Sequence, residues 1–131
     1  MEQKFDTIKN YLLELNYNIT HEDRKEGILM IQNLEEGINN LILGIADPIL
    51  IIEQYIFKIT KPSETIFQQL LQKNRDIVHG AFVLDETGEK VIFRDTLQIE
   101  NIDLNELEGS INSLSLLLSE YSENIIQFSK E

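Results

Sequence analysis

His79 is the residue in this sequence best suited to acid–base chemistry, because an imidazole titrates near neutral pH. Asp76 and Asp85 lie close to it in the chain, and a carboxylate beside a histidine is part of many hydrolytic sites. No serine or second histidine is placed to complete a triad. We therefore expect His79 to be structural, bonded to loop backbone, and keep a small enzyme that uses His79 as an alternative.

Other routes to catalysis are poorly supported. The chain has no cysteine, which excludes thiol nucleophiles, and its two histidines leave little for a histidine-based metal site. The six glycines form neither of the glycine-rich phosphate-binding motifs. The 23 acidic residues offer no pair that stands out as a catalytic acid and base. We expect no catalytic residue, no metal and no cofactor.

The charge balance restricts the partners. With 11 basic and 23 acidic residues the net charge is −12, so nucleic acid and anionic membranes are disfavoured as partners. The N-terminal residues 1–6 mix acids with bases and precede no apolar run typical of a signal peptide, which predicts a cytoplasmic protein. The most apolar stretch, residues 38–59, is interrupted by Asp47, Pro48, Glu53 and Lys58 and does not predict a membrane span.

The 131 residues, 42% of them hydrophobic, predict one domain over residues 1–131. Apolar residues at steps of three and four predict a helix over residues 2–15. Runs rich in branched residues at 28–34, 41–46 and 49–59 predict three strands, and the short connections between them indicate antiparallel pairing. Several of these runs are apolar on both faces, so a helix layer alone would not cover the sheet.

A second helix is predicted to begin at Pro62 and Ser63, with an apolar face formed by Ile66, Phe67, Leu70 and Leu71. Asn74 falls on that face, so we expect it to cap the helix or to bond loop backbone. Residues 79–85 and 90–99 then form a hairpin in which Gly88 needs a positive φ. By strand alternation Asp95 falls on the same face of the second arm as its apolar residues. This predicts a bulge at Asp95 or a hydrogen bond to Arg94 or another donor.

The last segment predicts a long helix. Asp103 with Glu106 forms a capping box, and apolar residues continue at helical spacing from Leu104 to Phe128. Leu116 lies off this seam and is a candidate for an exposed apolar contact. The predicted order is helix, three strands, helix, two strands, helix, which is an α+β domain with helices packed on an antiparallel sheet.

These elements, and several phrases within them, resemble the YbjN-like and Tir-chaperone (CesT-type) group of type III secretion chaperone-like domains. The phrases are Leu-Leu-Gln-Lys-Asn at 70–74, His-Gly-Ala-Phe-Val-Leu-Asp at 79–85, the Gly88 turn, Leu97, and Leu-Asn-Glu-Leu at 104–107. Residues 62–118 carry most of the resemblance, whereas residues 1–60 agree in element order and apolar pattern.

The resemblance implies a non-enzymatic, cytoplasmic homodimer that holds a partly unfolded segment of a client protein. By analogy, the second helix around Phe67, Leu70 and Leu71 contributes to the dimer interface together with the following strand, and the candidate client contacts are Tyr11, Leu13, Leu29 and Ile31. The YbjN-like branch leaves open a regulatory or stress-linked binding protein without a secretion role. A scaffold subunit without a transferable client also remains open.

Overall fold

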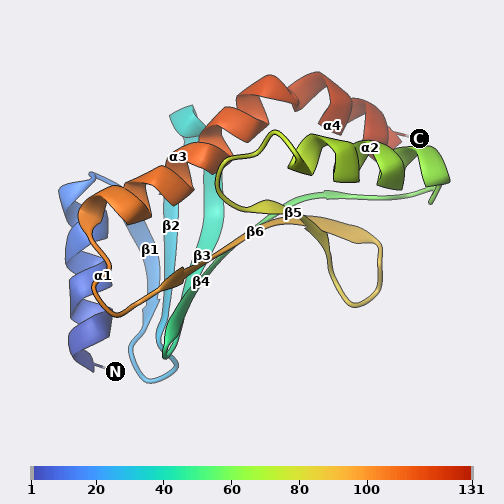
Figure 1. Ribbon diagram of the computed structural model, residues 1–131. Helices are drawn as coiled ribbons and strands as arrows, with labels where there is room; N and C mark the ends of the chain where they lie inside the picture. Colours follow the sequence, from blue (N-terminus) through green and yellow to red (C-terminus); the bar gives the residue numbers. More distant parts are fainter. Residues whose placement is uncertain (1, 131) are drawn as a thin grey trace.

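The computed structural model describes residues 2–130 and shows a six-stranded antiparallel sheet with four α-helices (Figure 1). The strand order across the sheet is β1-β2-β3-β4-β6-β5. The elements along the chain are α1 (Glu2–Glu14), β1 (Asn18–Asp23), β2 (Ile28–Asn33), the short 3₁₀ helix η1 (Leu34–Glu36), β3 (Ile38–Ala46), β4 (Ile49–Lys58), α2 (Glu64–Asn74), β5 (Ala81–Leu84), β6 (Lys90–Gln98), α3 (Leu104–Glu120) and α4 (Ser122–Lys130).

The predicted α+β class is confirmed, but the structure adds a strand before the three that the sequence predicts. β1 lies in a polar stretch for which no strand was predicted, and it pairs with β2 with a bulge between Ile19 and His21. An edge strand has one neighbour and can be solvated on much of its surface, so it needs little apolar sequence. The ion pair of Lys9 with Glu22 ties α1 to this strand.

The predicted single C-terminal helix is wrong, because the structure divides it at Tyr121. The Tyr121 backbone leaves helical geometry, with φ −108° and ψ 14°, although its N–H still donates to the Leu117 carbonyl oxygen. Its ring packs against Phe82, with 6.3 Å between ring centroids. Beyond the break α4 places Phe128 on Phe57, with ring centroids 6.0 Å apart. The apolar spacing continues across the bend, so periodicity could not reveal it.

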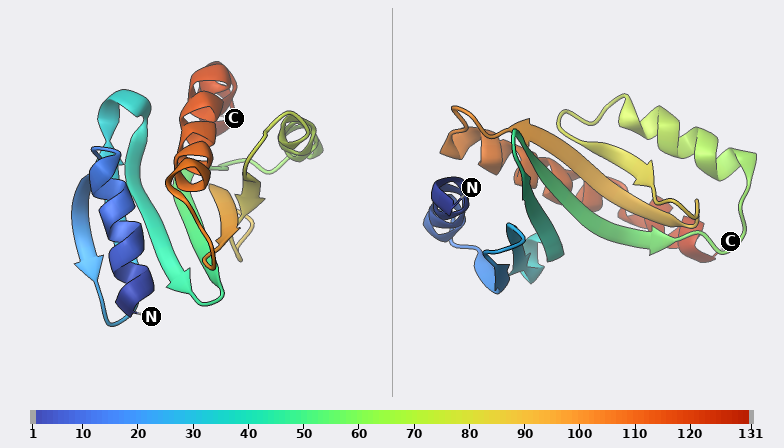
Figure 2. Two further views of the ribbon diagram at one scale, coloured as in Figure 1. Left: turned by 60° about the vertical axis from the view of Figure 1, so that its left-hand side comes forward. Right: turned by 90° about the horizontal axis from the view of Figure 1, so that it is seen from below.

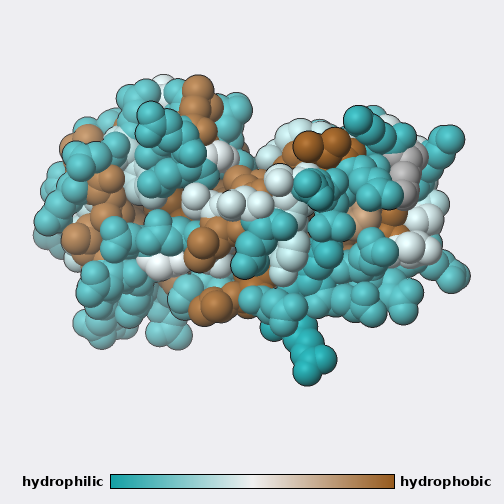
Figure 3. Space-filling view, turned by 90° about the horizontal axis from the view of Figure 1, so that it is seen from above, coloured by the Kyte–Doolittle hydropathy of each residue, from teal (hydrophilic) through white to brown (hydrophobic). Residues whose placement is uncertain are grey.

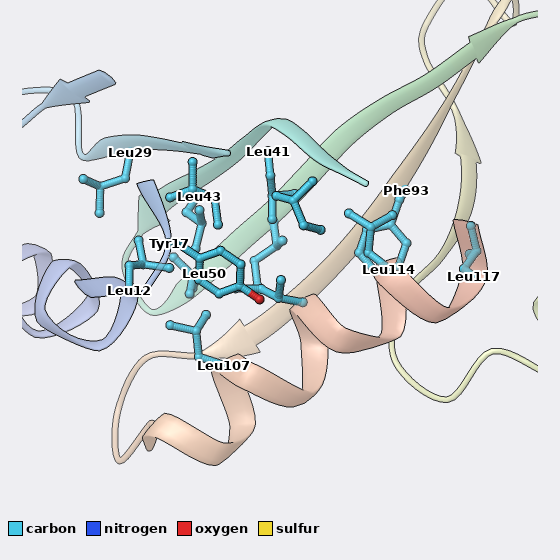
Figure 4. Packing of buried hydrophobic residues seen from close by; sticks show 14 of the residues in the cluster. Leu12, Tyr17, Leu29, Leu41, Leu43, Leu50, Phe93, Leu107, Leu114 and Leu117 are labelled. Carbon is cyan, nitrogen blue, oxygen red and sulfur yellow. The ribbon is translucent and has the colours of Figure 1, made fainter. Parts of the chain in front are cut away.

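The core lies between the sheet and the helices (Figure 4). Its largest side chains without exposed area come from α1 and from the strands: Phe5, Ile8, Leu12, Leu29, Ile31, Ile38, Leu41, Leu43, Leu50, Ile52 and Phe93. Gln54 is buried among them and is satisfied by backbone, since it accepts from the Asn39 N–H and donates to the Gly37 carbonyl, both at 3.0 Å. Asp95 accepts a 2.7 Å hydrogen bond from the Ser110 hydroxyl, which is the other donor that its position called for.

The predicted helix starts at Ser63 and Asp103 are confirmed. The Ser63 side chain accepts from the Ile66 N–H at 3.2 Å, and the Asp103 carboxylate accepts from the Glu106 N–H at 2.8 Å. Each cap satisfies a backbone donor that the first helical turn leaves unpaired. Among the described residues, no helix combines the length and apolar character needed to cross a membrane.

Candidate protein-binding surfaces

The structure gives His79 a backbone role. The Ser113 hydroxyl accepts from the His79 N–H at 3.3 Å and donates to the His79 carbonyl oxygen at 2.6 Å, which fastens the loop before β5 to α3. The His79 side chain is exposed and lies against Gly109. Asp85 is engaged in its own turn instead, where the Thr87 hydroxyl donates to its carboxylate and lowers the pKa of Asp85 below its ordinary value.

Residues 2–130 contain no cluster of three or more histidine, aspartate or glutamate side chains that could hold a metal ion. All buried side-chain nitrogen and oxygen atoms that the structure describes have hydrogen-bond partners. A site built for a charged substrate or ion would leave such atoms free to receive it.

Asn74 closes the outer edge of β5. Its side-chain Nδ2 donates to the Phe82 carbonyl oxygen at 3.1 Å, and its Oδ1 accepts from the Phe82 N–H at 2.7 Å. An amide that exchanges both bonds with one residue imitates the pairing of a neighbouring strand. Asn74 was expected to cap the helix or to bond loop backbone; it does bond backbone, but its partner is a residue of strand β5, and this fixes α2 beside the sheet edge.

An apolar pocket of about 270 Å³ opens between α2 and β5. We call its lining the α2–β5 surface; it consists of Phe67, Leu70, Leu71, Asn74, Phe82, Val83, Leu84 and Val91. Of the three dimer candidates from the sequence, Leu71 is 71% exposed, Phe67 is half-buried and Leu70 is buried at the base. The sequence prediction included the strand that follows the helix but did not name Val83 and Leu84, which belong to the continuous apolar run 81–84.

The four client candidates are divided by the structure. Leu13 is exposed on α1, while Tyr11 is half-buried and its hydroxyl donates to the Ile102 carbonyl oxygen at 3.3 Å. Leu29 and Ile31 have no exposed area, because they point into the core beneath the helices. Direct contact of these two side chains with a client is therefore ruled out in this conformation. β2 is apolar on both faces, so its sequence alone did not show which set of alternate residues the helices cover.

The other face of the sheet is covered by no helix of residues 2–130 (Figure 2). We call it the helix-free face; its apolar members are Ile28, Met30, Ile42, Ile49, Ile51 and Tyr55. Ile42 and Tyr55 are exposed and the others are half-buried. Gly44 pairs with Ile28 on one side and Ile51 on the other, and a side chain there would meet no atom within 4 Å. Gly44 therefore has open space above it in the apolar row.

A separate groove lies on the helix side, where the apolar residues form small patches among hydrophilic ones (Figure 3). Its walls are the 76–79 segment and the outer side of α3, including Leu116. Leu116 is exposed, as its position off the seam predicts. Tyr121 closes one end, where the pKa of its hydroxyl is raised by partial burial and then by the carboxylates of Glu120 and Asp76.

Comparisons with known proteins agree with this architecture. The structure of YbjN, a putative transcription regulator from E. coli, superimposes with a TM-score of 0.69 at 13% identity and covers 91% of each chain. The ExoU–SpcU complex from the type III secretion system of Pseudomonas aeruginosa gives a TM-score of 0.70 at 14% identity, over 95% of this chain and 99% of the other. The HopA1–SchA chaperone–effector complex gives 0.64 at 10% identity, over 99% and 96%.

At these identities the structural likenesses establish the fold alone. None of the curated proteins compared with the chain matches it in sequence. The family model CesT_Tir_1, in contrast, matches residues 1–131, which is the whole chain. The resemblance seen in the sequence is confirmed by this match and by the YbjN and secretion-chaperone structures together. The protein therefore belongs to the CesT_Tir_1 family and has the α+β fold of the type III secretion chaperones.

Proposed function

We propose that the protein is a non-enzymatic, cytoplasmic binding protein that works as a homodimer and holds an extended segment of a client protein. The observation that carries this proposal is the helix-free face, where apolar side chains lie beside the Glu53–Arg94 ion pair and no helix of the described residues covers them. An exposed apolar patch on a soluble domain commonly marks a site of protein contact. The complexes among the structurally similar proteins support a protein client over a small substrate.

The helix-free face suits an extended client better than a folded one. Ile28, Gly44 and Ile51 lie side by side on three neighbouring strands, and Gly44 leaves open space above the backbone between two isoleucines. One apolar client side chain could lie over Gly44, and its neighbours along an extended chain could pack on Ile42 and Tyr55. The outer edge of β1 lies at the same end of the sheet and offers backbone groups for strand addition.

The α2–β5 surface is the proposed dimer contact. Leu71 and Leu84 are large apolar side chains left exposed beside the pocket, and a second copy would bury both with the half-buried Phe67. Because the pocket is almost wholly apolar in its lining, it offers little to a polar ligand. Leu70 is buried at the base of the pocket, so it would support the contact surface without touching the second copy itself.

A second function is favoured by the likeness to YbjN. In that case the protein would be a regulatory or stress-linked binding protein that uses the same surfaces without a secretion apparatus. The two functions differ in the identity of the partner. An enzyme that uses His79 remains the alternative from a different functional class. Unaltered activity of a His79→Ala variant against every substrate found would exclude it.

Client binding is tested by affinity capture from the lysate of the source cells, read by mass spectrometry. We expect one dominant protein with the wild type and its loss with Ile42→Asp and with the milder Ile42→Thr. Leu34→Asp is the matched control, because Leu34 is 67% exposed on η1, away from the helix-free face. Loss only in a Tyr11→Asp/Leu13→Asp variant would move the client site to α1. Capture of nothing by the wild type would count against a client.

The dimer is tested by gel filtration with light scattering at micromolar concentration. We expect twice the 15.2 kDa chain mass for the wild type and for Leu34→Asp. Leu71→Asp would place a carboxylate in the apolar contact and should weaken dimerisation at least tenfold, giving the monomer mass. A stable wild-type monomer, or a Leu71→Asp variant that dimerises normally, would refute this interface.

A further inference from the structure

The groove between the 76–79 segment and α3 has features that the proposed client and dimer contacts do not use. It holds about 310 Å³ and is floored by Ile77 and Leu117. Val78 and Leu116 are 83% and 64% exposed, and both line it although they lie far apart in the sequence. It shares no lining residue with the α2–β5 surface. Two strongly exposed apolar side chains facing one hollow are typical of an anchor site for a partner.

The groove is held in shape by the contacts of its wall. The Ser113 hydroxyl bonds both backbone groups of His79, and the His79 ring lies against Gly109. Gly80 has φ +82°, and a side chain there would come within 2.5 Å of the Phe93 ring. The loop that carries Val78 is therefore fixed rather than free to collapse into the hollow. A preformed site loses less conformational entropy when a partner binds.

The charges around the groove favour a basic occupant. Its lining includes Asp76 and Glu120 and no lysine or arginine. α3, which forms one wall, carries three glutamates and no basic residue over its whole length. At the Tyr121 end the Lys73 ammonium already lies 4.8 Å from the ring centroid, so the aromatic face accepts a cation.

We propose that this groove docks a short segment of a second protein, one that presents an apolar side chain close to an arginine or lysine. The apolar side chain would enter between Val78 and Leu116, above Ile77 and Leu117. The basic side chain would reach the Asp76 and Glu120 carboxylates. A second copy of this chain has its proposed contact on the α2–β5 surface, which shares no lining residue with this groove, so the occupant is a different protein.

The test uses fluorescein-labelled 12-residue peptides in a glycine–serine background. Each carries one leucine and one arginine, separated by zero to four residues; control peptides carry glutamate for arginine or serine for leucine. Binding to the full-length protein is followed by fluorescence polarisation. We expect saturable binding of one or more leucine–arginine spacings and at least tenfold weaker binding of both control sets.

Variants locate the binding. We expect Val78→Ser/Leu116→Ser to weaken it at least tenfold and Leu34→Ser, a matched exposed leucine, to leave it unchanged. Glu120→Arg should move the preference towards the leucine–glutamate peptides. Ile42→Asp should bind normally, which separates this site from the client face. The proposal is overturned if no peptide binds, if the groove variants bind as well as the wild type, or if Leu116→Ser instead abolishes self-association seen by light scattering.

Discussion

Replacing Asn74 by alanine tests how the edge of β5 is held. The substitution removes two hydrogen bonds and leaves the N–H and C=O of the buried Phe82 without protein partners. A buried backbone group without a partner costs about 1–3 kcal/mol, so two cost roughly 2–6 kcal/mol. Water reaches the open edge in part, and alanine is the better helix former by about 0.5 kcal/mol. We therefore expect a loss of about 2–4 kcal/mol in the free energy of unfolding.

The assay is urea unfolding followed by far-UV circular dichroism, because the chain has no tryptophan. It is run at two protein concentrations, so that any effect on dimerisation is separated from the effect on the fold. Asn10→Ala is the control, since Asn10 is an exposed residue of α1 and its replacement should change stability by less than about 0.5 kcal/mol.

A second variant sharpens the result. Asn74→Asp keeps an acceptor for the Phe82 N–H but loses the donor, and it places a carboxylate next to the Phe82 carbonyl oxygen. This environment raises the pKa of the new carboxyl group, so its protonated form restores a donor. The free energy of unfolding of Asn74→Asp should therefore fall further below that of the wild type at pH 7 than at pH 4. A loss of unfolding free energy below about 1 kcal/mol for Asn74→Ala would refute the reasoning. So would a loss for Asn74→Asp that does not change with pH.

Further predictions follow from backbone geometry and from one buried hydroxyl. Gly80→Ala should cost more than Gly88→Ala in thermal unfolding: both residues have positive φ, worth about 1–2 kcal/mol, but only at Gly80 would the new Cβ meet the Phe93 ring. Equal losses would show that Phe93 moves aside freely. Tyr17→Phe should cost about 1 kcal/mol at neutral pH, because the Tyr17 hydroxyl donates to Glu36 at 3.1 Å. Burial first, and then Glu36, raises the pKa of Tyr17 above its ordinary value near 10, so this stabilisation is complete below pH 10 and declines at higher pH. Urea unfolding between pH 7 and 11 should show the difference between Tyr17→Phe and wild type shrinking; a constant difference would contradict it.

The elements predicted well are those whose local chemistry matches their tertiary role. Ser63 and Asp103 cap helices in any context, and the positive φ expected at Gly88 is present. The helix at 2–14 was predictable because its apolar residues face one way, and Phe5 and Ile8 are indeed fully buried.

The errors arose where sequence pattern does not distinguish two arrangements. Ile28 and Leu29 are neighbours of similar character on a strand apolar on both faces, so only the position of the helices decides which one is buried. β1 has one apolar residue, Ile19, and gains its place from backbone pairing to β2. Tyr121 keeps the helical spacing although its backbone departs from helical geometry. Its ring packs against Phe82, which lies on a strand distant in the sequence, and the local sequence does not show this contact.

The amide of Asn74 makes the two edges of the sheet unequal, and this limits how copies of the protein can assemble. A sheet with two open edges can join edge to edge without end, which is the route to fibres. Here the β5 edge is occupied at Phe82 by Asn74 and flanked by α2, whereas the outer edge of β1 has no neighbouring strand within the described chain. Head-to-tail addition of β1 to β5 is blocked, so growth by strand pairing stops after one added strand. With one edge closed in this way, the sheet is a poor template for its own polymerisation.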